Sequence, residues 1–175
     1  APVNEPRPRL YPSEGDRDLA QAAIQTVGDR QRGLIGLNPA TVRPYNRWGP
    51  SGWIGLARML IEGGYAPVLL GPPSEGERQR ELASACPGLL DWTGRFSIME
   101  LCEVVQRLDG LVSVDTGTAH LAGAVDTPVA VLYGVTEPHR FRPYGDRFVA
   151  VRAEDRSLES VTAEMVYQAL ESVLA

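Results

Sequence analysis

The sequence lacks lysine altogether, since all 17 basic side chains among its 175 residues are arginines. This absence excludes a Walker A phosphate loop, because the lysine of that motif must reach the β- and γ-phosphates of the nucleotide. It also excludes Schiff-base chemistry on a side-chain amine, and a protein-kinase ATP site, which needs a lysine on a strand. Any bound anion must therefore be held by arginine, hydroxyl groups or backbone N–H groups.

Cysteine and histidine are scarce, with two residues of each. No zinc-finger spacing exists. Cys86 and Cys102 lie in apolar helical patterns, so we expect them to be small buried side chains in a reducing compartment.

Long apolar runs and an excess of positive charge are also missing. No stretch approaches the roughly 20 apolar residues that span a bilayer, and no signal-peptide pattern is present. The formal net charge of −5 argues against nucleic-acid binding, which needs a cationic surface. The first residue is Ala1, which we interpret as the start of a processed chain or an excised fragment.

The length fits a single domain, at about 100–200 residues per domain. Residues 1–12 contain four prolines and are predicted to form an extended linker. Residues 13–175 are predicted to form one α/β domain that ends in a helix over 162–174. Apolar periodicity predicts the other helices at 14–27, 52–63, 75–86, 97–108 and 116–125, and strands at 33–37, 67–70, 89–92, 111–114, 128–133 and 148–151, with a long loop over 134–146.

Capping signals support three of these helix starts. Ser13 precedes Asp16 by three residues, and Ser97 precedes Glu100 by the same spacing, which is the pattern of a capping box. Thr162 is the predicted N-cap of the last helix, with Val161 and Val166 as a hydrophobic staple.

The predicted strands are apolar on both faces, which favours a mostly parallel sheet covered by helices on both sides. The expected fold is therefore a three-layer, Rossmann-like α/β domain. Such sheets bind ligands beyond the carboxyl ends of their strands, so the loops that follow the strands are the places to look for function.

The loop after the first strand, residues 38–50, carries Thr41, Arg43 and Arg47 and leads into a helix. Arginine forks bind phosphate oxygens bidentately, and the N-terminus of a helix adds partial positive charge. A diphosphate would suit these groups. The alternative is a solvent-exposed loop with two surface arginines.

Two further loops each contribute one candidate residue. Glu75, after the second strand, is placed to accept hydrogen bonds from a ribose diol, or else to favour a helix N-terminus electrostatically. Phe96, after the third strand, is placed to pack on an aromatic base, or else to be an ordinary core residue ahead of the Ser97 cap.

The loop after the fourth strand carries the densest set of polar groups. Asp115 ends the strand, Thr116 and Gly117 begin a helix, and His120 lies one turn further on the same face. Glycine lets a ligand approach the backbone closely, and the exposed N–H groups suit a phosphate. The alternative gives Asp115 a capping role and His120 a structural one. Four polar groups at one strand–helix junction favour function.

A long loop follows the fifth strand and carries Arg140 and Arg142 between prolines. These arginines either reach an anionic ligand or a partner domain, or belong to a solvated basic loop. No GxGxxG, nucleophile-elbow or HExxH motif is present, so NAD binding of the Rossmann type and triad hydrolysis lack their signals.

The order of these loops resembles a known family, the bacterial ADP-heptose:lipopolysaccharide heptosyltransferases of glycosyltransferase family 9. The resemblance extends from Pro8 to the last helix and corresponds to the C-terminal, donor-binding half of the family. Its motifs are Arg47-Trp48-Gly49-Pro50, Leu69-Leu70-Gly71, Thr93-Gly94 with Leu101, the segment Asp115–Ala124, Thr127-Pro128-Val129 and the segment Tyr133–Pro138.

The resemblance implies one half of a GT-B glycosyltransferase, and hence the donor domain of an inverting enzyme that transfers heptose or a related sugar from an ADP-activated donor to a lipopolysaccharide or other glycan acceptor. It implies no metal or other cofactor. Asp115 would hold donor-sugar hydroxyls, and Glu75 the ribose. Thr116 and Gly117 would donate to the diphosphate, with Thr41 on the opposite side. His120 would help to order that loop or contact the phosphates. Phe96 would line the adenine pocket.

Two departures from the family pattern are visible. The family often has a lysine two residues before the tryptophan as a phosphate cation, where this chain has Asn46, and its second loop hydroxyl is replaced by Val42. Binding of the leaving group would then fall to Arg43 or Arg47. These changes keep open an alternative, a non-catalytic nucleotide-binding or interaction module of the same fold.

The general base belongs, by the same resemblance, to an N-terminal acceptor domain that this sequence does not contain. The expected partners are an ADP-sugar, that acceptor domain, and a glycan or lipid-linked acceptor. The expected location is the cytoplasm, with any attachment to the inner membrane made through the missing domain.

We therefore predict that the 175-residue chain alone binds nucleotide weakly and transfers no sugar. A transfer assay with the purified chain, an ADP-sugar and an acceptor glycan checks this expectation. Sugar transfer by the isolated chain would refute it.

Overall fold

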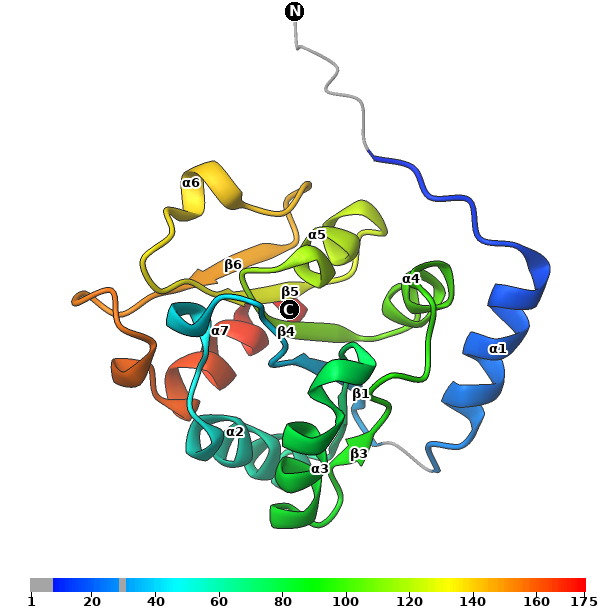
Figure 1. The fold of residues 1–175 in the computed structure, drawn as a ribbon, viewed down its shortest axis with the longest axis horizontal. Helices are drawn as coiled ribbons and strands as arrows, with labels where there is room; N and C mark the ends of the chain where they lie inside the picture. Colours follow the sequence, from blue (N-terminus) through cyan, green and yellow to red (C-terminus); the bar gives the residue numbers. More distant parts are fainter. Residues whose placement is uncertain (1–7, 29–30) are drawn as a thin grey trace, which may run out of the picture.

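The computed structural model describes residues 8–28 and 31–175, as one α/β body (Figure 1). Of the predicted linker, residues 1–7 lie outside the described part, and residues 8–12 form no helix or strand. The remainder of the chain alternates between strands and helices.

Six strands form a single sheet in which every neighbouring pair is parallel. The order across the sheet is β3-β2-β1-β4-β5-β6, so the chain first winds outward from β1 and then returns to its other side. This reversal between β1 and β4 is the switch point at which sheets of this kind bind ligands. The strands are β1 Gly33–Asn38, β2 Tyr65–Leu69, β3 Leu90–Asp91, β4 Gly110–Val114, β5 Val129–Leu132 and β6 Phe148–Val151.

Helices cover both faces of the sheet (Figure 1). Side chains of α2, α3 and α7 pack with one core cluster, and those of α1, α4 and α5 with the other. The helices are α1 Glu14–Gln25, α2 Pro50–Glu62, α3 Gly76–Ala85, α4 Ile98–Gln106, α5 Gly117–Ala124, α6 Pro138–Phe141 and α7 Ala163–Leu174, with short 3-10 turns η1 Pro44–Asn46, η2 Pro73–Glu75 and η3 Leu158–Ser160.

Strand β1 shows why its sequence is apolar without alternation. Ile35 and Leu37 point into the cluster shared with α2 and α7, whereas Leu34 points into the opposite cluster, and all three are fully buried. Successive side chains of a strand face opposite sides, so a strand covered on both sides must be apolar throughout. The predicted three-layer fold with a mostly parallel sheet is confirmed.

The predicted caps are present. Ser13 with Asp16 and Ser97 with Glu100 each form a complete capping box at the start of α1 and α4. The Thr162 hydroxyl accepts the backbone N–H of Met165 at the start of α7. Such caps are each worth about 1 kcal/mol of helix stability.

Most element boundaries lie one or two residues from the predicted ones, and three of the differences have clear local reasons. Helix α2 begins at Pro50 rather than 52, and α6 begins at Pro138 inside the predicted loop 134–146, because proline suits the first turn of a helix. Strand β3 is shorter than 89–92. The Asp91 carboxylate accepts the backbone N–H of Thr93 at 2.9 Å, which turns the chain away from the sheet.

Candidate functional site

The carboxyl ends of β1 and β4 are joined by a buried polar cluster at the switch point. The side-chain amide of Asn38 donates to the Ser113 hydroxyl at 3.1 Å and to the Thr116 hydroxyl at 3.0 Å. These bonds fix the start of α5 against the loop that follows β1. Sequence reasoning missed Asn38; its signal was a polar residue at the carboxyl end of an apolar strand.

Asp115 lies beside this cluster and is almost buried, with 9% of its surface exposed. Its carboxylate makes no hydrogen bond or ion pair with the residues that the structure describes. The N-cap of α5 is Thr116, so the alternative capping role of Asp115 is not realised. The carboxylate directly precedes the N-terminus of α5, where a negative charge is favoured. Such a carboxylate is suited to accepting hydrogen bonds from a ligand.

The negative charge of Asp115 also affects the pKa of Tyr133, the residue that directly follows β5. Burial raises the pKa of the Tyr133 phenol, and the negative charge of Asp115 raises it further. The phenol donates to the backbone carbonyl of Phe141 at 2.9 Å, which fastens the C-terminal end of α6 to the residue that follows β5.

The first turn of α5 is open. A Cβ atom placed on Gly117 would meet nothing within 4 Å, and the first N–H groups of a helix have no partner inside the helix. His120 is exposed on the same helix, so it is not a buried structural histidine. The helix start is therefore accessible to an anion.

Arg47 and Glu75 meet between the loops that follow β1 and β2. The guanidinium Nη1 and Nη2 atoms donate to the two carboxylate oxygens at 3.2 and 2.9 Å, and Nη2 also donates to the Thr41 carbonyl at 2.9 Å. Hydrogen bonding from Arg47 holds the pKa of Glu75 below its ordinary value, against the opposing effect of burial. The Thr41 hydroxyl accepts the N–H of Arg43 at 3.1 Å.

The side chains of Arg43, Phe96 and His120 make no hydrogen bond or ion pair with the other predicted residues in the described part of the chain. The Arg43 side chain is exposed and has no partner among the described residues. Phe96 is half-buried and packs edge-on against Trp92, with ring centroids 5.8 Å apart. These residues share the same edge of the sheet without forming one connected set.

Asn46, at the position where the resembled family often has lysine, is fully buried. Neither its amide nitrogen nor its amide oxygen has a hydrogen-bond partner among the described residues. A neutral, enclosed side chain at this position supplies no positive charge to the site.

The β5–α6 loop is held by a carboxylate that sequence reasoning did not single out. Glu137 pairs bidentately with Arg152, at 3.0 and 3.1 Å, and also with Arg156 at 3.1 Å. Of the two arginines that were singled out, Arg142 donates to the Gly145 carbonyl at 3.0 Å, and Arg140 is exposed.

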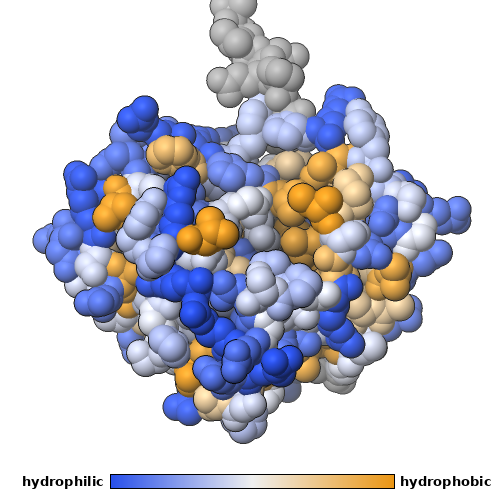
Figure 2. All heavy atoms as spheres, viewed as in Figure 1, coloured by the Kyte–Doolittle hydropathy of each residue, from blue (hydrophilic) through white to orange (hydrophobic). Residues whose placement is uncertain are grey.

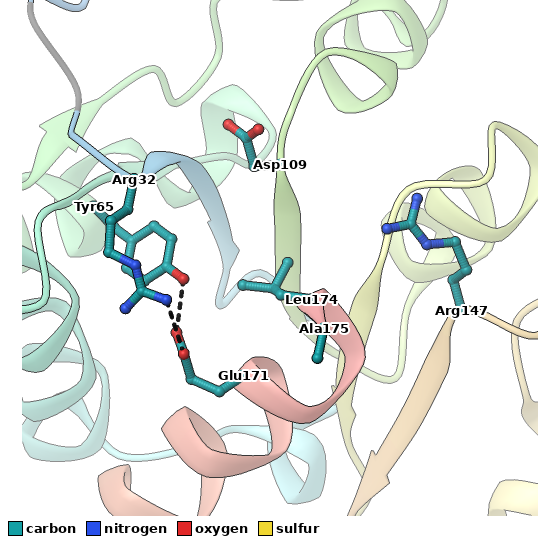
Figure 3. Close-up of a pocket in the computed structure, with 7 residues that line it drawn as sticks. All are labelled: Arg32, Tyr65, Asp109, Arg147, Glu171, Leu174 and Ala175. Carbon is teal, nitrogen blue, oxygen red and sulfur yellow. Dashed lines mark hydrogen bonds and ion pairs between the residues drawn. The ribbon is translucent and has the colours of Figure 1, made fainter.

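A pocket of about 400 Å³ lies at the opposite edge of the sheet, where the strands begin (Figure 3). The Glu171 carboxylate accepts from the Tyr65 phenol at 2.7 Å and from Arg32 at 3.1 Å, and Arg32 also stacks over the Tyr65 ring. The pocket's polar groups thus partly satisfy one another, away from the predicted binding loops. Its lining is Arg32, Tyr65, Asp109, Arg147, Glu171, Leu174 and Ala175.

Within residues 8–28 and 31–175, no group of three or more histidine, cysteine or acidic side chains is arranged to hold a metal ion.

Comparison with known proteins agrees with this architecture. A solved structure described as Escherichia coli heptosyltransferase WaaC with ADP matches with a TM-score of 0.75 and 28% identity, over 98% of this chain and 52% of that one. The fold is thus that of one half of a GT-B heptosyltransferase.

Sequence relatives narrow this class. The model for glycosyltransferase family 9 (heptosyltransferase) matches residues 1–170, and the chain belongs to this family. It is 29% identical to lipooligosaccharide heptosyltransferase 2 of Haemophilus influenzae, over 99% of this chain and 57% of that protein. It is 32% identical to lipopolysaccharide heptosyltransferase 1 of Escherichia coli, over 91% of this chain and 49% of that protein. The chain spans about half the length of these relatives.

The pocket predicts an unusual alkaline titration. Burial and the hydrogen bond to Glu171 raise the pKa of Tyr65 to about 12. Because the folded state holds this proton longer than the unfolded state, its stabilising effect is complete below pH 10 and is lost between pH 10 and about 12. The slope is at most about 1.4 kcal/mol per pH unit for one such group. No lysine titrates in this range to mask it.

Tyr65→Phe should therefore cost about 1 kcal/mol at pH 7 and reduce the loss of stability above pH 10. Urea unfolding between pH 8 and pH 11.5 measures both effects. Tyr11→Phe is the matched control, because Tyr11 is exposed. An alkaline slope that Tyr65→Phe leaves unchanged would contradict the assignment.

Proposed function

We propose that this chain is the donor-binding half of an inverting glycosyltransferase. The complete enzyme transfers heptose, or a related sugar, from an ADP-activated donor to a lipopolysaccharide or other glycan acceptor. Family membership supports sugar transfer, and a relative solved with ADP supports the nucleotide. The chain alone binds the nucleotide and leaves catalysis to the two-domain protein.

The unpaired Asp115 carboxylate is the observation that carries this proposal. It lies at the switch point, almost buried, beside an open helix N-terminus. A nucleotide-sugar satisfies both features at once, because sugar hydroxyls donate to the carboxylate while phosphate oxygens accept from the helix N–H groups. A nucleotide without a sugar would leave Asp115 beside a like charge.

The diphosphate is assigned to the two facing loops. Gly117 and Thr116 offer backbone N–H groups, while the Thr116 hydroxyl is already engaged with Asn38. Thr41 lies opposite, on the loop that follows β1. The same loop carries two arginines, Arg43 and Arg47. His120, exposed one turn along α5, helps to order the loop or contacts a phosphate.

The nucleoside is assigned to the loops after β2 and β3. Glu75 accepts from the ribose hydroxyls, and Phe96 lines the adenine pocket. These two loops are joined by the N–H of Gly94, which donates to the Gly71 carbonyl at 2.8 Å, so they form one wall.

The reaction that follows from these roles is a single displacement at the anomeric carbon. The acceptor oxygen forms its bond to this carbon as the bond to the phosphate oxygen breaks, and ADP leaves with the electron pair. A base in the N-terminal half takes the acceptor proton. The donor half contributes by binding the growing negative charge on the diphosphate, which is electrostatic stabilisation by preorganised groups. No metal or other cofactor is assigned to this step.

The second half is proposed to cover the carboxyl edge of the sheet. Four large apolar side chains stand exposed in the segments that join β1 to α2 and β5 to β6, and Val42 among them is 97% exposed. Apolar residues form separate patches among hydrophilic ones on the face in Figure 2. An interdomain contact would bury the loop residues, which are Val42, Tyr45, Val135 and Phe141.

The proposed partners are an ADP-sugar, the N-terminal acceptor domain, and a glycan or lipid-linked acceptor, with no nucleic acid. The proposed location is the cytoplasm, with any attachment to the inner membrane through the missing half. No helix in the described part of the chain is long and apolar enough to cross a membrane.

Asn46 favours one alternative, a nucleotide-binding or interaction module without catalysis. Its burial and neutrality mean that the position used by the family for a cation is lost here. Such a module would bind ADP and ADP-heptose equally, whereas a donor domain distinguishes them.

Calorimetric titration of ADP and ADP-heptose separates these functions. A donor domain should bind ADP-heptose more tightly than ADP. Asp115→Ala should weaken the binding of ADP-heptose by about 1.5–3 kcal/mol and the binding of ADP by less. Asp115→Ala should not lower the free energy of unfolding, because the wild-type charge is unpaired. Equal affinity of the wild-type chain for both ligands would instead favour the module.

Gly117→Ala tests the approach of the ligand to the backbone. A methyl group at this position meets open space, so folding stability should stay the same or rise by up to about 1 kcal/mol. ADP affinity should fall several-fold, because the methyl group would occupy the space next to the helix N–H groups. Gly123→Ala is the contrasting control: its Cβ would lie 2.5 Å from the Tyr144 carbonyl oxygen, so it should lower stability. Unchanged ADP binding by a stable Gly117→Ala variant would exclude this phosphate position.

A further inference from the structure

Arg47 uses its guanidinium to join two loops of the site. Two of its hydrogen bonds go to the Glu75 carboxylate after β2, and a third goes to the Thr41 carbonyl after β1. Both side chains are largely covered, with Arg47 31% and Glu75 15% exposed. A planar, bidentate fork of this kind fixes the orientation of both partners.

This pairing leaves little positive charge for a diphosphate. The charge of Arg47 is already balanced by Glu75. Transferring its fork to a phosphate would leave Glu75 with only the more distant Arg78, at 3.9 Å, while a second anion lies nearby. The side chain of Arg43, on the same loop, is exposed and has no hydrogen-bond or ion-pair partner among the described residues. The two arginines are therefore not equivalent.

The same pairing suits Glu75 to a diol. An ionised carboxylate has about four lone-pair sites, and the Arg47 fork occupies one on each oxygen. One site remains on each oxygen, so the two oxygens can still accept two neighbouring hydroxyl groups. The fork sets the direction in which those sites point.

We propose that Arg47 is a positioning residue, which orients the Glu75 carboxylate toward the ribose hydroxyls of the donor nucleotide, while Arg43 supplies the cation for the diphosphate. This inference rests on the proposed function, since it assumes that the site holds a ribonucleotide. It gives the chain a different cation position from the family lysine that Asn46 replaces.

The charge state of Glu75 provides a second readout. Two cations face its carboxylate, Arg47 from the β1–α2 loop and Arg78 from α3 at 3.9 Å. Arg47 keeps the pKa of Glu75 low, and burial acts in the opposite direction. Without Arg47, only Arg78 would oppose the effect of burial, so the pKa of Glu75 would be higher than in the wild type and the acceptor would be protonated at a higher pH.

The test compares ADP with 2′,3′-dideoxy-ADP by calorimetry, using the 175-residue chain at pH 7.5 and pH 5. The ratio of the two affinities isolates the diol, because phosphate titration affects both ligands alike. The wild-type chain should prefer ADP by about tenfold or more at both pH values. Arg47→Gln should reduce this preference to a few-fold at pH 7.5 and further at pH 5, with little change for the dideoxy ligand.

Three variants serve as controls, and thermal melting confirms that each is folded. Glu75→Gln should remove the preference and its pH dependence. Arg43→Gln should lower the affinity for both ligands by the same factor and leave the preference for ADP over the dideoxy ligand unchanged. Arg78→Gln removes a cation near Glu75 without breaking the fork, so the preference should persist.

The outcomes separate this inference from the proposed function. If Arg47→Gln weakens both ligands equally, Arg47 binds the diphosphate and the inference is overturned while the donor site stands. If the wild-type chain binds ADP without preferring it to the dideoxy ligand, Glu75 does not contact the ribose and the inference is also overturned. If the wild-type chain binds neither ligand, the proposed function fails and the inference fails with it.

Discussion

The hydrogen bonds of Asn38 across the switch point are the interaction on which the candidate site depends. A parallel sheet brings all its carboxyl ends to one edge, and the reversal of strand order between β1 and β4 opens a gap there. Asn38 spans that gap from β1 to the start of α5. The loop with Thr41 and the loop with Asp115 are thereby held opposite each other.

Around this cross-link, the polar groups of the candidate site are of two kinds, those that have partners within the chain and those that do not. Arg47, Glu75 and Glu137 have partners with good geometry, and they hold loops in place. Asp115 has none among the described residues, and the Cβ position of Gly117 at the start of α5 faces open space. Buried polar groups are normally paired, which is why we propose that a ligand supplies the partner of Asp115.

Much of the fold follows from local patterns in the sequence. The apolar strands, the capping boxes at Ser13 and Ser97, and the helix cap at Thr162 all required only neighbouring residues to recognise. The site was partly predictable for a related reason, since strand ends are where a parallel sheet binds ligands. Pairing between distant segments was not, because nothing near Arg47 in the sequence indicates that its partner is Glu75, or that Asn46 is enclosed.

The division of the core by the sheet has a mechanical consequence. The β1–α2 loop runs into the layer packed by Trp53 and Leu56, whereas α5 belongs to the opposite layer through Ala119 and Ala122. The proposed diphosphate contacts thus come from two layers that share no core side chain. At this edge the two layers are joined by the sheet backbone and by the Asn38 hydrogen bonds to Ser113 and Thr116, so a substitution at Asn38 would change the spacing of the two loops while each layer keeps its own packing.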